Sequence, residues 1–378
     1  MFTTGALAQV QKLPEPQELL VIAEEGTLMI GDDPSSKVPQ GTVLTTTHQR
    51  GPWNYIPSLK GWMHDSELVS YSEAIESCTE TLQENPSAQL HHLRGIAFIG
   101  QKDFLRAVRD LETAYDLGES SISLHFNMAL CYRNLEQFPA AIRQLTLILD
   151  NFPDEGRPYQ ERGDLFLEQG DYQAALRDFD KALELAPRSP ELRNARGVAL
   201  RLLGRYEDAI ASYSKAIEDD PKFAEAYLNR GYARKSLNQD QGALGDYDQA
   251  IKLDPTNDAK NELSWLLATS PQESVRNPER ALALANDVSK ATNNQNGEYL
   301  DTLAAALAVN GKFEAAVEAA ALAETLLAGN PGVKQVRERR RRYEKKQTFI
   351  ETPEERIESV RTFVEENEQS EEESNSES

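Results

Sequence analysis

Two apolar, helix-periodic segments separated by a short polar break form the dominant pattern of this chain. In the stretch "RGDLFLEQGDYQAALRDFDKALELAP", which begins at Arg162, apolar residues recur at spacings of three and four on both sides of Gly170. This spacing places the apolar side chains on one face of each helix. The pattern therefore predicts two antiparallel helices joined at the glycine.

The same unit recurs at a period of 34 residues. "RGVALRLLGRYEDAIASYSKAIEDDP" begins at Arg196 and "RGYARKSLNQDQGALGDYDQAIKLDP" begins at Arg230, and diverged copies begin at Arg94 and Met128. Helical pairs with such a period stack into a solenoid, because each pair can bury its apolar face only against its neighbours. The sequence therefore predicts a mainly α fold built as an α-solenoid.

Small residues and helix breakers mark where the helices approach one another and where they end. Each unit has an alanine in its second segment and another small or apolar residue seven positions later, on the same helix face. Proline closes successive units, since it cannot continue a helix. These residues are Ala107, Ala141, Ala175, Ala209 and Ala243, then Ala114, Ile148, Ala182, Ala216 and Ala250, with Pro153, Pro187, Pro221 and Pro255 at the unit ends.

These positions resemble the tetratricopeptide repeat (TPR). The match is carried by Gly163, Tyr172, Ala175, Phe179, Ala182 and Pro187 with their counterparts one period later, and it covers about residues 69 to 328. The resemblance implies a right-handed superhelix whose concave groove binds peptides or protein surfaces. It divides a domain at 68–328 into a half repeat at 69–87, repeats at 88–121, 122–155, 156–189, 190–223 and 224–257, and irregular repeats at 258–296 and 297–328.

A charged pair recurs within the units. Arg162 and Asp178 lie at equal distances from Gly170, so in a helical hairpin they are expected to meet between the two helices. The pair returns as Arg94 with Asp110 and as Arg230 with Asp246, whereas Arg196 is expected to face Ser212. An unpaired charge between helices is costly. We therefore predict a structural brace and not a binding or catalytic pair.

The chain before the repeats has the pattern of short strands. Runs such as "ELLVIAEEGTLMI" and "GTVLTTTHQ" are rich in β-branched residues and are separated by turn residues. Residues 18–67 are therefore predicted to form a small β-barrel that covers the open face of the half repeat. This region resembles a bacterial SH3-like domain at Gly41, Val43, Gly51, Trp53, Tyr55, Gly61 and Trp62. We expect Trp53 and Trp62 to belong to its core and not to a ligand platform.

Both ends of the chain differ from the repeats. Residues 1–17, with "GALAQ", are either a disordered start or the remnant of an export signal that begins upstream, and the second interpretation favours the periplasm or cell envelope over the cytoplasm. Residues 329–364 are predicted to form capping helices, the first a basic helix over 333–346. The glutamate-rich tail at 365–378 is predicted to be disordered.

Composition and the absence of known motifs disfavour several classes of function. A net charge of −22 and a pI near 4.7 disfavour a nucleic-acid partner, and the sequence has no apolar run long enough to span a bilayer. It also contains no phosphate-binding glycine loop, CxxC pair, HExxH motif or nucleophile elbow, and its nearest histidines, His91, His92 and His125, are expected to pack or to face the groove. We therefore expect a non-enzyme without cofactor or metal.

The groove is where we expect the function. Carried over from matching units, first-helix positions that face away from the second helix form a strip of apolar and basic residues, which suits an extended ligand with apolar anchors and acidic groups. Asn127 and Asn229 match the asparagine of the family's carboxylate clamp, but its lysines are missing. The strip consists of Phe126, Leu130, Arg133, Gln160, Asp164, Asn194, Val198, Arg201, Leu228, Tyr232 and Lys235.

Two functions are compatible with this sequence. The first is a protein-protein interaction scaffold that binds a peptide or protein segment in the groove. The alternative is a cell-envelope ligand-binding protein in which the SH3-like domain recognises cell-wall peptide and the repeats are a spacer.

Overall fold

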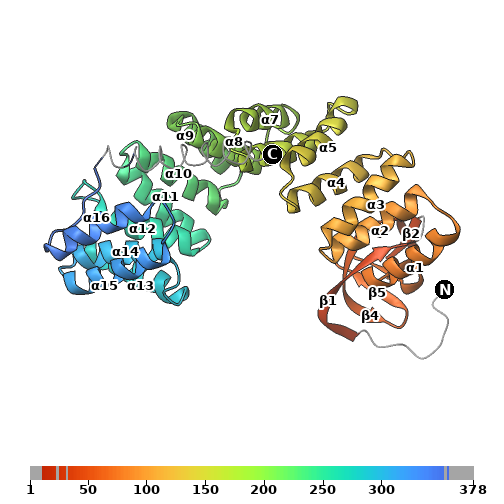
Figure 1. The fold of residues 1–378 in the computed structure, drawn as a ribbon, viewed down its shortest axis with the longest axis horizontal. Helices are drawn as coiled ribbons and strands as arrows, with labels where there is room; N and C mark the ends of the chain where they lie inside the picture. Colours follow the sequence, from red (N-terminus) through yellow and green to blue (C-terminus); the bar gives the residue numbers. More distant parts are fainter. Residues whose placement is uncertain (1–10, 23–24, 31–32, 353–355, 357–378) are drawn as a thin grey trace. The chain divides into compact units, whose positions relative to one another are not determined.

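The computed structural model describes residues 11–22, 25–30, 33–352 and 356. These residues form two compact units that divide between residues 153 and 154 (Figure 1). The expectations for residues 1–10, for the acidic tail and for most of the last capping helix lie outside the described residues. No helix among those described is long and apolar enough to cross a membrane.

The first unit begins with one antiparallel sheet. Its strand order is β3-β2-β6-β5-β4-β1-β7. The strands are β1 (Gln11–Val21), β2 (Glu25–Ile30), β3 (Asp33–Pro39), β4 (Val43–Arg50), β5 (Trp53–Ile56), β6 (Gly61–His64) and β7 (Leu68–Val69).

The sheet is curled around a small core of its own. Every strand contributes one buried residue to the same cluster, including both end strands, β3 and β7. A sheet whose two end strands share a core must bend strongly. The members are Val21, Leu28, Val38, Leu44, Ile56, Met63 and Leu68. The strand-rich region is thus confirmed, whereas the SH3-like assignment stays a prediction.

Strand β1 begins before the expected boundary at residue 18. Gln11 and Lys12 pair with Gln49 and His48 of β4, and the register then shifts before Gln17. The proline-containing residues between these pairs lack the alternation of a regular strand, which explains why the sequence pattern alone did not indicate this part of β1.

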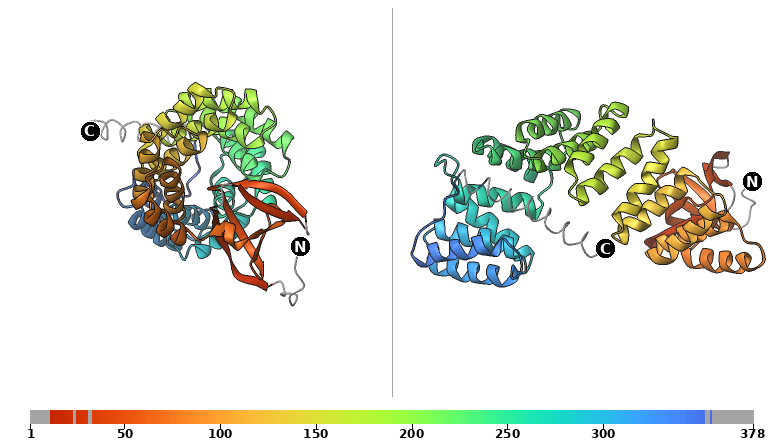
Figure 2. Two further views of the ribbon diagram at one scale, coloured as in Figure 1. Left: turned by 90° about the vertical axis from the view of Figure 1, so that its right-hand side faces the viewer. Right: turned by 45° about the horizontal axis from the view of Figure 1, so that its top comes forward.

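The α-helices of the first unit continue from the sheet. The half repeat is α1 (Tyr71–Glu84), and two helical pairs follow: α2 (Ala88–Gly100) with α3 (Phe104–Asp116), and α4 (Ile122–Asn134) with α5 (Phe138–Asn151). Figure 2 shows the strands beside the first helices. Leu20 of β1 is fully buried in one cluster with Ala74 and Cys78 of α1 and with Leu93 and Ala97 of α2. The sheet therefore covers the apolar face that the half repeat would otherwise expose.

The second unit is a stack of helical pairs. The pairs are α6 (Gly156–Glu168) with α7 (Tyr172–Leu185), α8 (Pro190–Leu202) with α9 (Tyr206–Asp219), α10 (Ala224–Ser236) with α11 (Asp240–Leu253), α12 (Asn257–Thr269) with α13 (Pro278–Ala291), and α14 (Gly297–Val309) with α15 (Phe313–Leu326). The basic helix α16 (Val333–Glu344) buries Val336 and Tyr343 in a cluster with Ala316 and Ala320 of α15. The predicted helical solenoid is confirmed.

Glycines in the first helices explain how closely the pairs pack. A Cβ atom on Gly163 would lie 2.7 Å from the ring of Phe179, and one on Gly231 would lie 2.5 Å from the ring of Tyr247. Any side chain at these positions would push the two helices of the pair apart. The glycine and the aromatic ring of the repeat thus form one packing unit.

The predicted brace is present in each pair that has both residues. The Arg162 guanidinium donates to both carboxylate oxygens of Asp178 over 2.7 and 2.8 Å, and Asp178 is only 6% exposed. Arg94 with Asp110 and Arg230 with Asp246 form the same fork. The expectation for Arg196 was wrong. Its guanidinium turns to Asp180 of the preceding pair, because Ser212 instead donates to the carbonyl oxygen of Arg193.

Candidate functional site

The residues of the strip lie on first helices of the repeats, on α4 in the first unit and on α6, α8 and α10 in the second unit. Within the second unit, we call the side of these helices that carries the strip, together with the equivalent side of α12, the first-helix face. In the first unit, α4 places Phe126 and Arg133 half-buried and leaves Leu130 42% exposed. In the second unit Asn194 is buried, and half-buried positions are Gln160, Asp164, Val198, Arg201, Leu228, Tyr232 and Lys235.

Amide side chains connect successive first helices. Asn229 of α10 donates through Nδ2 to Asn194 Oδ1 of α8 over 3.0 Å, and Asn194 donates to Glu225 Oε1 over 3.0 Å. Asn127 of α4 bonds to His92 of α2 in the same relative position. The asparagines that matched a carboxylate clamp are thus engaged between neighbouring repeats.

The basic residues of the strip differ in their surroundings. Arg201 stacks with its Cζ atom 5.9 Å from the ring centre of Tyr232. Lys235 instead has Nζ 3.2 Å from Glu262 Oε2. Burial alone would lower the pKa of Lys235, but Glu262 and Glu351 raise it overall, so the ammonium group is charged and neutralised within the fold. In α8 and α10 the basic character of the strip therefore rests on Arg201.

The chain's own C-terminal residues lie on this face at α12. Trp265 is the ninth residue of α12, as Tyr232 is the ninth residue of α10. The ring of Phe349 lies 5.8 Å from that of Trp265, and the indole Nε1 of Trp265 donates to Glu351 Oε1 over 3.2 Å. The backbone N–H of Glu351 donates to the carbonyl oxygen of Thr269 over 2.9 Å. A segment without regular secondary structure is thus held by a ring, a carboxylate and its own backbone.

Arg356, five residues after Glu351, contacts the turn between α10 and α11. Its guanidinium meets the Asp240 carboxylate in a fork of 2.5 and 3.0 Å, and both side chains are almost fully buried. It also donates to the carbonyl oxygen of Lys235 and to Asn238 Oδ1, and its Nε donates to Glu351 Oε2. We call the acceptors from Asp240, Lys235 and Asn238 the Asp240 socket.

Sequence reasoning did not find the socket, although a signal for it exists. The second helices α3, α5, α7, α9 and α15 each begin with an aromatic residue, whereas α11 begins with Asp240. A buried carboxylate at a position where other repeats place a ring cannot be a requirement of the repeat itself. Comparing the copies at this position would have singled out Asp240.

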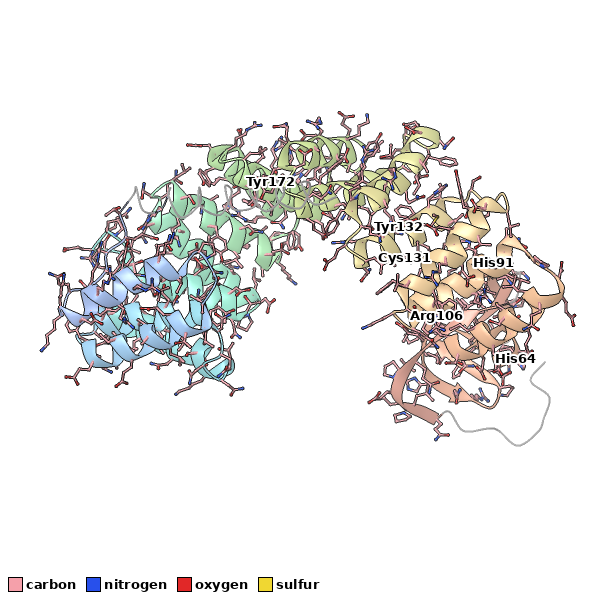
Figure 3. All side chains as sticks on the ribbon, viewed as in Figure 1. His64, His91, Arg106, Cys131, Tyr132 and Tyr172 are labelled. Carbon is pink, nitrogen blue, oxygen red and sulfur yellow. The ribbon has the colours of Figure 1, made fainter. Side chains whose placement is uncertain are left out.

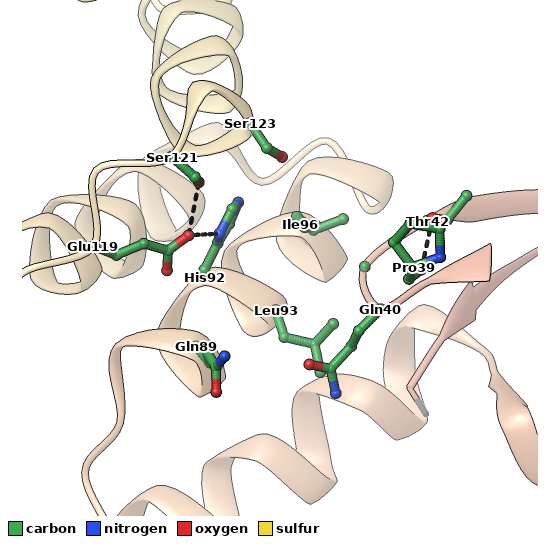
Figure 4. A pocket seen from close by; sticks show the side chains of 11 residues that line it. Pro39, Gln40, Thr42, Gln89, His92, Leu93, Ile96, Glu119, Ser121 and Ser123 are labelled. Carbon is green, nitrogen blue, oxygen red and sulfur yellow. Dashed lines mark hydrogen bonds and ion pairs between the residues drawn. The ribbon is translucent and has the colours of Figure 1, made fainter. Parts of the chain in front are cut away.

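A cavity of about 930 Å³ lies in the first unit (Figure 4). It is bounded by the Pro39–Thr42 turn, by α2 and by the start of α4. At its wall His92 Nδ1 lies 2.5 Å from Glu119 Oε1, and Ser121 donates to the same oxygen. His92, Glu119 and Ser121 are residue types of a hydrolase triad, but the serine bonds the carboxylate and the other histidine nitrogen bonds Asn127. This wall lacks the serine-histidine bond that would activate a nucleophile.

Histidines and cysteines elsewhere in the first unit are also in structural surroundings. His91 bonds Asp110 and His125 bonds Gln144, each over 2.9 Å. Cys131, labelled on α4 in Figure 3, is fully buried, and this burial raises the pKa of its thiol to about 12. Within the described part of the chain, no group of His, Cys, Asp or Glu side chains could hold a metal ion.

The sheet carries a row of rings on its outer side. Asn54, Ile56 and Met63 point inward, so the neighbouring Trp53 and Trp62 point outward and are half-buried. The expectation that both tryptophans belong to the core was wrong, because strand alternation assigns the inward positions to other residues. His48 pairs with Tyr55 and Tyr55 with Trp62, while Trp53 pairs with His64, at ring-centre distances of 5.1 to 6.1 Å. We call these five residues the aromatic row.

Comparison with known proteins agrees with the helical geometry. Models of the tetratricopeptide repeat match residues 124–155, 161–222 and 203–258, so the chain contains tetratricopeptide repeats. The C-terminal part of a TPR repeat-containing protein from Cytophaga hutchinsonii is 20% identical over 62% of this chain and 94% of that chain, with a TM-score of 0.51. This likeness shows a shared fold.

Other solved structures match shorter parts. YrrB, described as a TPR protein with an unusual peptide-binding site, is 22% identical over 48% of this chain and 94% of its own, with a TM-score of 0.42. MamA from Desulfovibrio magneticus is 17% identical over 44% of this chain and 95% of its own, with a TM-score of 0.43. No curated protein matches the sequence.

Proposed function

We propose that this chain is a non-catalytic interaction scaffold whose tetratricopeptide repeats bind an extended segment of a partner protein on the first-helix face. The observation that carries the proposal is the position of the chain's own residues 349–351 on this face of α12. There the face holds a backbone N–H at Thr269 and a ring and a carboxylate at Trp265. On the same face of α8 and α10 we expect a further segment to bind.

The side chains of α8 and α10 indicate the chemistry of that segment. Val198 and Leu228 are half-buried apolar positions, and the guanidinium group of Arg201 stacks on the ring of Tyr232. A ligand with an apolar anchor and an acidic group near Arg201 would complement this surface. Since Lys235 is neutralised by Glu262, we assign the attraction for an acidic group to Arg201.

Affinity capture with the full-length chain tests the proposal. Proteins bound from an extract of the source organism would be identified, and the main partner titrated against the wild type, Arg201→Glu and the control Arg188→Glu. Arg188 is exposed in the turn before α8, so its reversal changes net charge without altering the face. We expect at least a tenfold loss of affinity for Arg201→Glu and none for the control. Equal affinities of all three proteins would contradict the proposal.

The aromatic row favours a second candidate function. In this alternative, the sheet recognises cell-wall peptide in the envelope and the repeats act as a spacer. Outward-facing rings at Trp53 and Trp62 could supply the stacking surface for such a ligand. Co-sedimentation of the full chain with purified cell wall tests it: Trp62→Ala should reduce binding, whereas Leu59→Ala in the adjoining turn should not. If the wild type stays in solution, this candidate is excluded.

A further inference from the structure

The C-terminal residues on α12 have the features of a ligand bound in cis. Residues 347–352 follow α16 without regular secondary structure, and Glu351 is tied to the repeats by a backbone hydrogen bond to Thr269. The other ties are side-chain anchors: Phe349 against Trp265, Glu351 on the indole nitrogen, and Arg356 in the Asp240 socket. Residues 347–352 belong to no helix or strand, so these contacts, with the burial of Phe349 beside Val336 and Tyr343 of α16, hold the segment on α12.

The chemistry of the Asp240 socket determines which side chain can occupy it. Asp240 is 0% exposed, and besides Arg356 it accepts a hydrogen bond from Ser270. An empty socket would leave a buried carboxylate without a counter-charge, which is strongly unfavourable. Only a guanidinium can make a planar fork to the carboxylate while also donating to the Lys235 carbonyl and to Asn238. The occupant must therefore present an arginine.

We propose that the first-helix face of α10 and α12 is an arginine-dependent peptide site that the chain keeps closed with its own residues 349–352 and Arg356. A partner segment opens it by offering the same anchors, an aromatic residue followed by a glutamate and then by an arginine that enters the Asp240 socket. This inference rests on the proposed function and names the ligand chemistry and regulation of that face.

Tethering explains why the site is closed in the isolated chain. A segment joined to its site by a short linker has an effective concentration in the millimolar range, so a free peptide of equal intrinsic affinity competes poorly. Its apparent affinity is reduced by the fraction of molecules in which the site is open. Weakening the tethered arginine should therefore strengthen binding of a free peptide.

Fluorescence anisotropy with a labelled synthetic peptide of the sequence 347–360 tests this directly. The full-length chain would be compared as wild type, Arg356→Ala and Arg341→Ala, in which an exposed arginine of α16 is removed as the matched control. We expect the peptide to bind Arg356→Ala at least tenfold more tightly than wild type, and Arg341→Ala to equal wild type. A peptide with its own arginine replaced by lysine should bind at least tenfold more weakly. Equal binding to all three chains, or no binding to Arg356→Ala, would overturn the proposal.

A second measurement covers the case in which Arg356→Ala fails to fold. In the wild-type chain, hydrogen exchange of the Glu351 amide should be at least tenfold faster than that of the buried amides of Leu266 and Leu267 in α12. Equal protection would mean that the segment is a permanent part of the fold, and would overturn the proposal. Dimers of the wild-type chain that disappear in Arg356→Ala would show that residues 349–356 of a second copy occupy the socket. That result would contradict the proposal that a different partner protein binds there.

The result of the peptide experiment can be distinguished from the result of the partner-capture experiment. Arg201→Glu changes α8 and Tyr232's neighbourhood but leaves the Asp240 socket intact. If partner capture survives in Arg201→Glu while the peptide behaves as expected, the assignment of the partner to Arg201 fails and the cis-ligand proposal stands. The reverse result would reject only the cis-ligand.

Discussion

Asp178 of α7 accepts two hydrogen bonds from Arg162 of α6, and this fork is repeated by Asp110 with Arg94 and by Asp246 with Arg230. The carboxylates are buried, so each pair is balanced only while both partners are present.

Replacing Asp178 by alanine should therefore destabilise the second unit by about 1 to 3 kcal/mol, because Arg162 loses its partner between the helices. Asp178→Ala combined with Arg162→Leu should recover part of the loss. Urea denaturation followed by circular dichroism would measure both. Asp180→Ala is the control: its pair with Arg196 is more exposed and should contribute less than about 1 kcal/mol. A full-size effect in the control would contradict the assignment.

Two glycines of one helical pair should respond to alanine with opposite signs. Gly231→Ala places a Cβ 2.5 Å from Tyr247 and should destabilise by about 1 to 3 kcal/mol through overpacking. Gly245 of α11 is exposed, with open space at its Cβ position, so Gly245→Ala should stabilise by about 0.5 to 1 kcal/mol. Thermal unfolding distinguishes them, and a shift in the same direction for both would refute the packing argument.

The buried thiols should react only after unfolding. Burial raises the pKa of Cys131 to about 12 and also raises the pKa of Cys78. At pH 8 the folded chain should therefore react far more slowly with a thiolate-specific reagent than the chain in denaturant, where the thiol pKa is about 8.5. Rapid modification of both thiols in the folded chain would exclude this burial.

The same shift predicts how stability changes in alkaline solution. Above about pH 8.5 the unfolded thiols lose protons that the folded thiols retain, so the free energy of unfolding should fall as the pH rises. Because tyrosines and lysines also titrate at high pH, the measurement should compare the wild type with Cys131→Ala. The decline between pH 8 and pH 10 should be smaller in the variant, and identical slopes would count against the mechanism.

The junction between sheet and helices should depend on Leu20. This side chain is fully buried between β1, α1 and α2, so Leu20→Ala should cost about 2 to 5 kcal/mol. Ile30, which is 50% exposed, provides the control, and Ile30→Ala should change stability by less than about 0.5 kcal/mol. Hydrogen exchange should show faster opening of α1 in Leu20→Ala. Unchanged exchange there would show that the sheet does not stabilise the half repeat.

Because the second unit is built from sequence repeats, much of its structure could be predicted from the sequence. Because each unit is a copy of the same helical hairpin, comparing the copies identified the helix pairs, the glycine positions and the Arg162–Asp178 brace. These features depend on residues 16 positions apart in one hairpin, so local periodicity and symmetry suffice to place them. The first-helix strip was likewise placed on its helices, whereas its role in binding stays a prediction.

Other features depended on contacts that no local pattern contains. The aromatic row faces outward because the curled sheet has only one interior. Packing decides which alternate residues of each strand fill that interior. Lys235 is neutralised by Glu262 of the next pair. Arg356 reaches Asp240 across 116 residues. Sequence alone determined the repeating unit, since short-range hydrogen bonding and apolar periodicity repeat with the residues. Tertiary structure alone decided which face is occupied, because burial and charge pairing depend on distant segments meeting in space.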